Sequence, residues 1–452
     1  MKRIVPGVAV LIGWMALTGC APPGDPMIHK IVSDISEENI RQSVEKLASF
    51  GTRHTLSDVT SAARGIGAAR YWIKAEFDRY AADSGGRLVV ETQSFIAPPD
   101  GKRVNRDVEI VNIVATLPGK DSDSRDRIYL VSGHYDSICS DVMDSASDAP
   151  GANDDASGVA AVLELARVMS KHEFDATLVF AAVAGEEQRL IGSDYMAKEF
   201  RKRDVNIAGM FTNDIIGNTV GGNGVLDRTH VRVFSEGVPI TESTEEQKKE
   251  RMDTGNENDS PARQLARYID TIAGEYVPGL DVVMIYRRDR FLRGGDHKSF
   301  SEQGYPAVRF TEMNEDYRRQ HQNVRVEGGV QYGDLPQFVD YGYVAQVARV
   351  NAAALVSLAL APAPPANLRV LTEKLENTTR LEWDVGKEHD LEGYEVVWRE
   401  TTAPQWQHTM DVGPSTGCTH PLSKDNYIFG VRSVDKTGLR SVVAYPRPWK
   451  PE

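Results

Sequence analysis

Cysteine is scarce in this chain of 452 residues, which contains only three, Cys20, Cys139 and Cys418. We place Cys139 and Cys418 in different domains, so a disulfide bond between them is not expected. Cys139 lies close in sequence to several acidic motifs, but no histidine stands at a spacing that would mark a catalytic thiol pair. A cysteine-dependent enzyme is therefore not indicated.

Positive charge is also in short supply. The chain has 52 lysine and arginine residues against 65 aspartate and glutamate residues, which gives a formal net charge of −13. This balance argues against nucleic acid as a partner. A hydrophobic content of 41% and a charged content of 26% are typical of a folded soluble protein, and the length predicts two domains.

Long uninterrupted hydrophobic runs are lacking as well. Residues 4–17 are apolar, but the run is too short for a stable membrane helix. Residues 341–360 form a longer apolar run that contains Gln346, Arg349 and Asn351. We therefore expect residues 341–360 to be a closing helix that packs on a sheet, and not a transmembrane helix.

The first twenty residues have the pattern of a targeting signal. Lys2 and Arg3 precede the apolar run, which ends in Leu17-Thr18-Gly19-Cys20. This ending resembles a bacterial lipobox and predicts a lipoprotein signal peptide at residues 1–20, with membrane attachment through a lipid on Cys20. The resemblance implies a location in the bacterial cell envelope, at the outer membrane. Secretion after ordinary signal cleavage is the alternative.

Residues 28–361 are predicted to form an α/β catalytic domain. Near-continuous apolar strands alternate with helices, which is typical of a mostly parallel central sheet with helices on both faces. Residues 217–260 are glycine-rich and then highly charged, and we interpret them as a solvated insertion. The main expected strands are residues 87–96, 107–117, 128–131, 178–183, 207–212, 282–285 and 306–310.

The C-terminal part has a different periodicity. Residues 362–366 read as a stiff proline-rich linker. In residues 367–452 apolar side chains alternate with polar ones in short runs, which predicts a small all-β sandwich. Trp383, Tyr394 and the pattern Tyr427-x-Phe429-x-Val431 resemble a fibronectin type III module. That resemblance implies a spacer, or a domain that binds a surface or polymer.

Three polar motifs stand just past predicted strands. They read GHYD at 133–136, PGANDDASG at 150–158 and AGEEQRLIGS at 184–193. Sites in parallel α/β sheets form outside the carboxyl ends of the strands, so we expect these motifs to meet. In the first motif, His134 can bind a metal ion while Asp136 lies on the same face of the extended chain and orients its ring.

The second and third motifs supply carboxylates. Asp154 and Asp155 lie in a glycine-flanked loop before a helix, where either a ligand role or a helix N-cap is expected. Of the adjacent pair Glu186 and Glu187, one carboxylate can bind metal while the other takes a proton from water. A charged surface pair is the alternative interpretation.

Asp214, after the strand at 207–212, and His297, after Gly294-Gly295, complete the candidate cluster. Together the motifs supply two imidazoles and three carboxylates. This ligand set suits Zn²⁺, with Co²⁺ or Mn²⁺ as further options, and it does not suit a thiolate site.

In combination, these motifs and GGDHKSF at 294–300 resemble the metal-ligand signatures of the M28 peptidases, the co-catalytic zinc aminopeptidase family, over most of residues 37–360. The resemblance implies two zinc ions per chain that share Asp154. The remaining ligands would be His134 and Asp214 for one ion, and Glu187 and His297 for the other.

The same resemblance assigns roles in catalysis. Glu186 would be the general base and then the acid. Asp136, which we expect to orient the ring of His134, is the other predicted catalytic residue. The peptide bond between Asp154 and Asp155 is expected to be cis. The implied reaction is hydrolysis of the N-terminal residue of a peptide substrate.

Three alternatives stay open. A glutaminyl cyclase resembles these peptidases but uses one zinc ion. A carboxypeptidase of the same family is suggested by the arginines at 287–293, which could bind a substrate carboxylate or form a solvated basic turn. A receptor-like, adhesive lipoprotein should have lost metal ligands, whereas here every expected ligand type is present.

Overall fold

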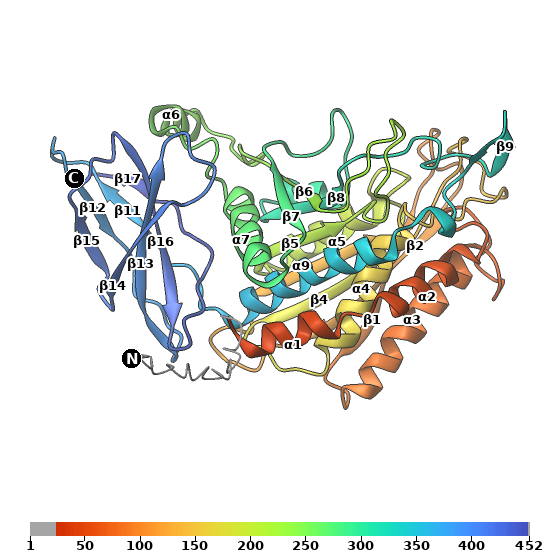
Figure 1. The fold of residues 1–452 in the computed structure, drawn as a ribbon, viewed down its shortest axis with the longest axis horizontal. Coiled ribbons are helices and arrows are strands. Elements are labelled where there is room, and N and C mark those ends of the chain that lie inside the picture. The colour runs from red at the N-terminus through yellow and green to blue at the C-terminus, as the bar shows by residue number, and fades with distance from the viewer. Residues whose placement is uncertain (1–23, 451–452) are drawn as a thin grey trace, which may run out of the picture.

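The computed structural model describes residues 24–450. Two parts are visible in Figure 1: an α/β domain built on a large sheet, and a smaller β-sandwich formed by the C-terminal residues. This arrangement confirms the predicted fold class. The predicted signal peptide and the lipidation site at Cys20 lie outside the described residues.

An eight-stranded mixed sheet forms the centre of the α/β domain. Its strands are β1 (Val89–Ala97), β2 (Val108–Leu117), β3 (Ile128–His134), β4 (Thr177–Val183), β5 (Ile207–Asn213), β6 (His230–Ser235), β7 (Asp281–Ile285) and β8 (Ala307–Glu312). They lie in the order β1-β2-β4-β3-β5-β8-β6-β7. The central strands β4, β3, β5 and β8 run parallel to one another, so their carboxyl ends lie at one edge of the sheet.

Helices cover both faces of this sheet. They are α1 (Pro26–Asp34), α2 (Glu37–Ala48), α3 (Gly65–Asp83), α4 (Ala156–Met169), α5 (Ile191–Lys202), α7 (Pro261–Tyr276), α8 (His297–Glu302) and α9 (Tyr341–Leu360), while α6 (Glu245–Thr254) covers neither face. One face packs against α1 to α4, α7 and α9, and the other against α5 and α8. Burial of the central strands between two helical layers explains their continuous apolar sequences.

Short polar residues fix where the key helices begin. The Ser36 side chain accepts a hydrogen bond from the backbone N–H of Asn39 at the start of α2. The Asp155 carboxylate does the same for Gly158 at the start of α4, and Ser260 caps α7, whose first residue is Pro261. The cap of α4 therefore stands directly beside the candidate ligand Asp154.

The segment 217–260 is more structured than the sequence suggests. Residues 230–235 form β6, which lies inside the central sheet between β8 and β7 with alternating buried side chains. The prediction of a solvated insertion was wrong for β6. It holds for α6, which has no buried residue. The sequence of β6 lacks the continuous apolar run by which the central strands were recognised. This is because β6 is an antiparallel neighbour of β8 near the sheet edge, where only one side of a strand must be apolar.

The C-terminal part consists of two facing sheets. One contains β15 (Gly417–His420), β12 (Thr379–Glu382), β11 (Arg369–Leu371) and β17 (Arg447–Trp449), and the other contains β14 (His408–Gly413), β13 (Leu391–Glu400) and β16 (Tyr427–Asp435). Trp383 packs edge-on to Tyr394 in the core between them, with ring centroids 5.4 Å apart. The predicted β-sandwich is confirmed, while its likeness to fibronectin type III stays a prediction.

The β-sandwich is docked on the α/β domain through buried charges. Asp259, just before α7, is fully buried and accepts hydrogen bonds from Arg267 at 2.9 Å and from Arg399 of β13 at 2.8 and 2.9 Å. A second buried ion pair joins Arg127 to Glu388 at 3.2 Å. Such pairs are specific in geometry, so the sandwich has a defined orientation and is not a loosely tethered appendage.

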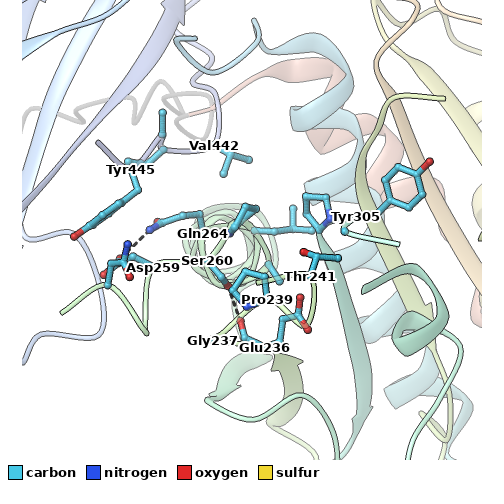
Figure 2. A pocket seen from close by; sticks show the side chains of 18 of the residues that line it. Glu236, Gly237, Pro239, Thr241, Asp259, Ser260, Gln264, Tyr305, Val442 and Tyr445 are labelled. Carbon is cyan, nitrogen blue, oxygen red and sulfur yellow. Dashed lines mark hydrogen bonds between the residues drawn. The ribbon is translucent and has the colours of Figure 1, made fainter. Parts of the chain in front are cut away.

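A cavity of about 520 Å³ lies between the two parts. Figure 2 shows Glu236, Pro239 and Thr241 of the α/β domain on one side of it and Val442 and Tyr445 of the sandwich on another. No candidate metal ligand lines this cavity.

Within residues 24–450, one helix, α9, is long and apolar enough by composition to cross a membrane, with a mean hydropathy of 1.4. It is largely buried against α1, α4 and α7 and the central sheet (Figure 1). This burial agrees with the prediction of a closing core helix.

Two further small elements lie between β8 and α9. They are the hairpin of β9 (Arg325–Glu327) and β10 (Val330–Tyr332), followed by the 3-10 turn η1 (Pro336–Phe338). This loop, residues 313–335, passes over the edge of the sheet at which the candidate ligands gather.

Candidate metal centre

The candidate ligands lie at the carboxyl ends of the parallel strands. His134 is the last residue of β3, Asp214 directly follows β5, and Glu187 follows β4 by four residues. Asp154 lies in the loop between β3 and α4. Because these strands are hydrogen-bonded neighbours, segments far apart in the sequence deliver their side chains to one place.

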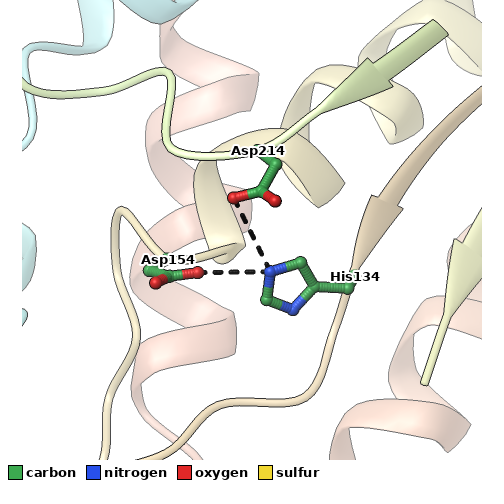
Figure 3. A group of neighbouring side chains, drawn as sticks. All are labelled: His134, Asp154 and Asp214. Carbon is green, nitrogen blue, oxygen red and sulfur yellow. Dashed lines mark ion pairs between the residues drawn. The ribbon is translucent and has the colours of Figure 1, made fainter. Parts of the chain in front are cut away.

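One ligand group consists of His134, Asp154 and Asp214, shown in Figure 3. His134 Nε2 lies 3.2 Å from Asp154 Oδ1 and 3.9 Å from Asp214 Oδ1. All three residues are buried. One ion placed among these atoms would have an imidazole nitrogen and two carboxylate oxygens within reach.

A second group shares Asp154. His321 Nε2 lies 3.0 Å from Asp154 Oδ2 and 3.0 Å from Glu187 Oε1. The two oxygens of Asp154 therefore face different imidazoles, one in each group. In each group the three potential ligand atoms lie within 4.8 Å of one another. The arrangement is that of two adjacent cation sites bridged by one carboxylate.

The structure does not bring His297, the second predicted imidazole ligand, to either group. His297 is the first residue of α8, where its Nε2 lies 2.7 Å from the backbone oxygen of Arg288 and 3.3 Å from the carboxylate of Asp289. These contacts engage the ring in the loop before α8. His297 belongs to neither ligand group. In the second group, His321 stands in the place that was predicted for His297.

The sequence did contain a signal for His321. The strand at 306–310 was expected, and β8 pairs in parallel with β5, so the loop after β8 opens at the same edge as Asp214. His321 is the first histidine in that loop. It was missed because the loop has no periodicity.

Asp136 supports the first group from behind. Its backbone oxygen lies 3.2 Å from His134 Nδ1, and its carboxylate lies 3.6 Å from the same nitrogen. The carboxylate also accepts hydrogen bonds from the backbone N–H groups of Glu186 and Glu187 at 3.2 and 3.1 Å. Asp136 therefore positions both the ring of His134 and the Glu186-Glu187 turn.

Asp155 acts within the fold next to its neighbour. Its carboxylate accepts hydrogen bonds from the backbone N–H of His134 and of Gly158. The Asp154–Asp155 peptide bond is cis, as the family resemblance implies. Asp154 faces the imidazoles of His134 and His321, and Asp155 is the N-cap of α4.

Glu186 is half-buried next to both ligand groups. Burial, together with the carboxylates of Asp214, Glu187 and Asp296, raises the pKa of Glu186 well above its ordinary value, against the opposing effect of His134. A carboxyl group with a raised pKa accepts a proton more readily than an ordinary carboxylate and can release it again. This property fits a proton-transfer role and does not fit a solvated surface charge.

The centre carries an excess of negative charge. Although burial lowers the pKa of His134, the surrounding carboxylates, with Glu186 as the largest influence, raise it well above its ordinary value. Glu187 and Asp154 have the same effect on His321. Bound cations would relieve this excess, and the imidazole and carboxylate donor set fits zinc.

Arg309 is the permanent cation of the centre. It is fully buried, and its Nη2 lies 2.9 Å from Asp214 Oδ1. Burial alone would raise the pKa of Asp214, but Arg309 reverses the effect and holds that pKa below its ordinary value. Arg309 therefore keeps Asp214 ionised and ready to bind a cation.

Neither remaining cysteine forms a disulfide bond. Cys139 and Cys418 are both free, and burial raises the pKa of each thiol. A raised pKa disfavours the reactive thiolate, in agreement with the expectation that Cys139 is a bystander.

The profile of peptidase family M28 matches residues 112–325. A protein of Leptosphaeria maculans named "Probable zinc metalloprotease" is 49% identical over 427 residues, which cover 94% of this chain and 98% of the relative. A protein of Pyrenophora teres with the same description is 47% identical over 427 residues, covering 94% of this chain and 88% of the relative.

Solved structures share the fold at low identity. The LapA aminopeptidase of Legionella pneumophila superposes with a TM-score of 0.52 at 18% identity and covers 74% of each chain. A glutaminyl cyclase from an Acidobacteriales bacterium superposes with a TM-score of 0.51 at 14% identity, covering 76% of this chain and 98% of that one. These likenesses establish the α/β architecture alone.

The relatives overturn one prediction. They come from fungi, whose cells have no outer membrane in which a bacterial lipoprotein could be anchored. The predicted location in a bacterial envelope, with a lipid on Cys20, is therefore wrong.

The match over 94% of the chain to fungal relatives at nearly half identity, the profile match and the clustered ligands lead to one conclusion. This chain is a zinc metalloprotease that belongs to peptidase family M28.

Proposed function

We propose that this chain is an aminopeptidase that binds two zinc ions, with Co²⁺ or Mn²⁺ as possible substitutes, and releases the N-terminal residue of peptide substrates. The observation that carries the proposal is the position of Asp154, whose two carboxylate oxygens face the imidazoles of His134 and His321. A single-ion site would not need a second imidazole on the far side of the same carboxylate.

The proposed ligands divide between two ions. They are His134, Asp154 and Asp214 for the first ion, and Asp154, Glu187 and His321 for the second. When bound, zinc lowers the pKa of a water molecule and polarises the scissile carbonyl group.

The chain's own residues would handle the proton. Glu186, with its raised pKa, would take a proton from the attacking water and donate it to the nitrogen of the leaving amine. Asp136 would hold Glu186 in place through its backbone N–H. Arg309 would keep Asp214 ionised throughout the cycle.

The carboxypeptidase alternative loses its main support. The arginines before α8 were its candidate carboxylate-binding groups, and three of them are occupied by internal acids. Arg290 and Arg293 both pair with Glu315, at 3.1 and 2.6 Å, and Arg288 lies 2.9 Å from Glu302. A substrate carboxylate would have to displace these partners.

One comparison tests the proposal. The zinc-loaded chain is offered leucine 4-nitroanilide and its N-acetyl derivative. We expect hydrolysis of the free-amino compound alone, and about two zinc ions per chain by elemental analysis. Equal hydrolysis of both compounds would point to an endopeptidase, and cyclisation of N-terminal glutamine without peptide hydrolysis would point to a glutaminyl cyclase.

A further inference from the structure

His321 reaches the second ligand group from an exposed and strained position. Its side chain is 42% exposed, and its backbone has a φ of 55°, in the left-handed region that a residue with a side chain normally avoids. The other two ligands of that group, Asp154 and Glu187, are buried. Because burial does not fix the backbone of His321, contacts on either side of it in the chain must do so.

Two residues after His321, the chain is joined to a loop that is distant in sequence. The backbone N–H of Ser140 donates a hydrogen bond to Asn323 Oδ1 at 3.0 Å, and the backbone N–H of Asn323 donates to Ser140 Oγ at 3.1 Å. Each residue thus donates once and accepts once, which fixes both the separation and the relative orientation of the two loops. We call this pair of hydrogen bonds the Ser140–Asn323 clamp.

The clamp holds a segment that is otherwise bonded to itself. Within the described part of the chain, every other hydrogen bond of residues 322–333 stays inside the loop 313–335. Examples are the hairpin of β9 and β10 and the contact between the Arg319 side chain and the backbone oxygen of Gln331. Without the clamp, no hydrogen bond would join this segment to the rest of the described chain.

The neighbouring contacts do not replace the clamp. Before His321, the Gln320 side chain donates to Asp154 Oδ2 at 3.1 Å and lies 3.5 Å from Arg293. The first of these contacts uses a ligand oxygen that a bound ion would occupy, and the second is long for a hydrogen bond. After His321, the next contact with another loop is made by Asp334, thirteen residues further on. The clamp is therefore the close contact that does not depend on a proposed ligand.

The other half of the clamp rests on a well-fixed part of the chain. Ser140 directly follows Cys139, which is fully buried, and the Ser137 side chain donates to the backbone oxygen of Ala149 at 2.7 Å. This loop begins after His134, a ligand of the first group. The clamp therefore holds the backbone near His321 against the loop that follows the first imidazole.

We propose that the Ser140–Asn323 clamp positions His321 for the second ion and thereby sets the affinity of that ion, while the first ion is bound independently of the clamp. Ser140 and Asn323 are positioning residues, because they act through the backbone of His321. Contacts that orient a metal ligand typically change metal affinity by about 10- to 100-fold. This inference rests on the proposed two-ion centre.

The test measures how tightly each zinc ion is held. The zinc-loaded full-length chain is equilibrated with buffers of decreasing free Zn²⁺ concentration, and the zinc that stays bound is measured by elemental analysis. We expect two release midpoints for the wild type. His321→Ala, which lacks one ligand of the second group, identifies the midpoint of the first ion.

Ser140→Ala removes the acceptor of the Asn323 backbone N–H. Both hydrogen bonds of the clamp are exposed, so water can take the place of the lost partner and the variant should fold. We expect the second ion to be released at a free Zn²⁺ concentration about 10-fold higher than in the wild type. The midpoint of the first ion should not change.

Two further variants separate positioning from general effects on the fold. Asn323→Ala breaks the other hydrogen bond of the clamp and should shift the same midpoint in the same direction, which also provides the test if Ser140→Ala does not fold. Ser140→Thr keeps the hydroxyl group and should release both ions as the wild type does.

Ser147→Ala is the matched control. Ser147 is exposed, lies in the same loop as Ser140, and is hydrogen-bonded to Asp144 of that loop through its backbone N–H. The substitution therefore makes the same chemical change in the same loop without touching the clamp. We expect both midpoints to stay at their wild-type values.

Several results would overturn the proposal. They are a wild-type second midpoint in Ser140→Ala and Asn323→Ala, an equal shift in Ser147→Ala, a Ser140→Thr variant that behaves like Ser140→Ala, and a shift of both midpoints by the same factor. A wild type that binds a single zinc ion would instead contradict the proposed two-ion function, so the two failures are distinguishable.

Discussion

His321 Nε2 lies 3.0 Å from Glu187 Oε1, although the two residues come from loops that follow different strands of the central sheet. Glu187 follows a buried strand and is itself buried, whereas His321 lies in the loop 313–335 with 42% of its side chain exposed. The second cation site is thus closed by one partly exposed residue.

This relationship predicts the effect of removing His321. His321→Ala should bind about one zinc ion per chain instead of about two, because the first group of ligands stays intact. His297→Ala is the control and should keep two ions. Elemental analysis after dialysis against buffered zinc provides the measurement, and loss of zinc from the His297 variant alone would reinstate His297 as the ligand.

Glu186→Gln should separate metal binding from catalysis. Glu186 is in neither ligand group, so the variant should retain about two zinc ions while its kcat falls by about 10²- to 10⁴-fold, the usual contribution of a general base. Glu187→Gln should lose zinc as well as activity. A Glu186→Gln enzyme with wild-type kcat would show that another group moves the proton.

Charge removal at Asp259 should destabilise the whole chain. Asp259→Asn leaves the buried guanidinium groups of Arg267 and Arg399 without a counter-charge. Breaking a buried ion pair in this way costs about 3–5 kcal/mol, which urea denaturation can measure.

Glu376→Gln offers a control for the Asp259 variant. Its partner Arg380 lies on the surface of the sandwich, so we expect a far smaller change in the free energy of unfolding. Equal effects of the two substitutions would mean that the contact between the α/β domain and the sandwich contributes little to stability.

Glu236 predicts a dependence of stability on pH. It lines the cavity between the two parts of the chain (Figure 2), and burial raises its pKa to about 7. The folded state therefore holds a proton that the unfolded state releases at a lower pH. The contribution of Glu236 to the free energy of unfolding is fully present at acidic pH and is lost as the pH rises toward 7.

Glu236→Gln should remove that loss. The unfolding free energy is measured for both proteins at pH 5 and at pH 8. From pH 5 to pH 8 the advantage of the variant over the wild type should grow by an amount on the order of 1–3 kcal/mol. A gain of the same size at both pH values would show that the carboxyl group does not titrate in this range.

The parts of the site that could be predicted are those attached to buried parallel strands. Continuous apolar runs revealed β3, β4 and β5, and the polar residues after them had to lie at one edge of the sheet. For this reason the sequence predicted that His134, the pair Glu186 and Glu187, and Asp214 lie at one edge of the sheet, which is where the structure places them.

The parts that failed depend on contacts that no local pattern records. His297 follows two glycines and looks like a displayed ligand, but a backbone oxygen of Arg288 engages its ring. His321 sits in a loop whose course is set by tertiary contacts, such as the hydrogen bond from Gln320 to Asp154. β6 was concealed by its polar flanks and by pairing with strands distant in sequence.

Because both ligand groups share Asp154, bound ions would join segments that lie far apart in the sequence. Ions held by ligands scattered from residue 134 to residue 321 would act as cross-links, and the longest loop between successive ligands of one ion runs from Glu187 to His321. Closing so long a loop removes much of the chain's conformational entropy in the unfolded state. Chelation should therefore free the segment 313–335 for proteolytic cleavage well before the central sheet unfolds.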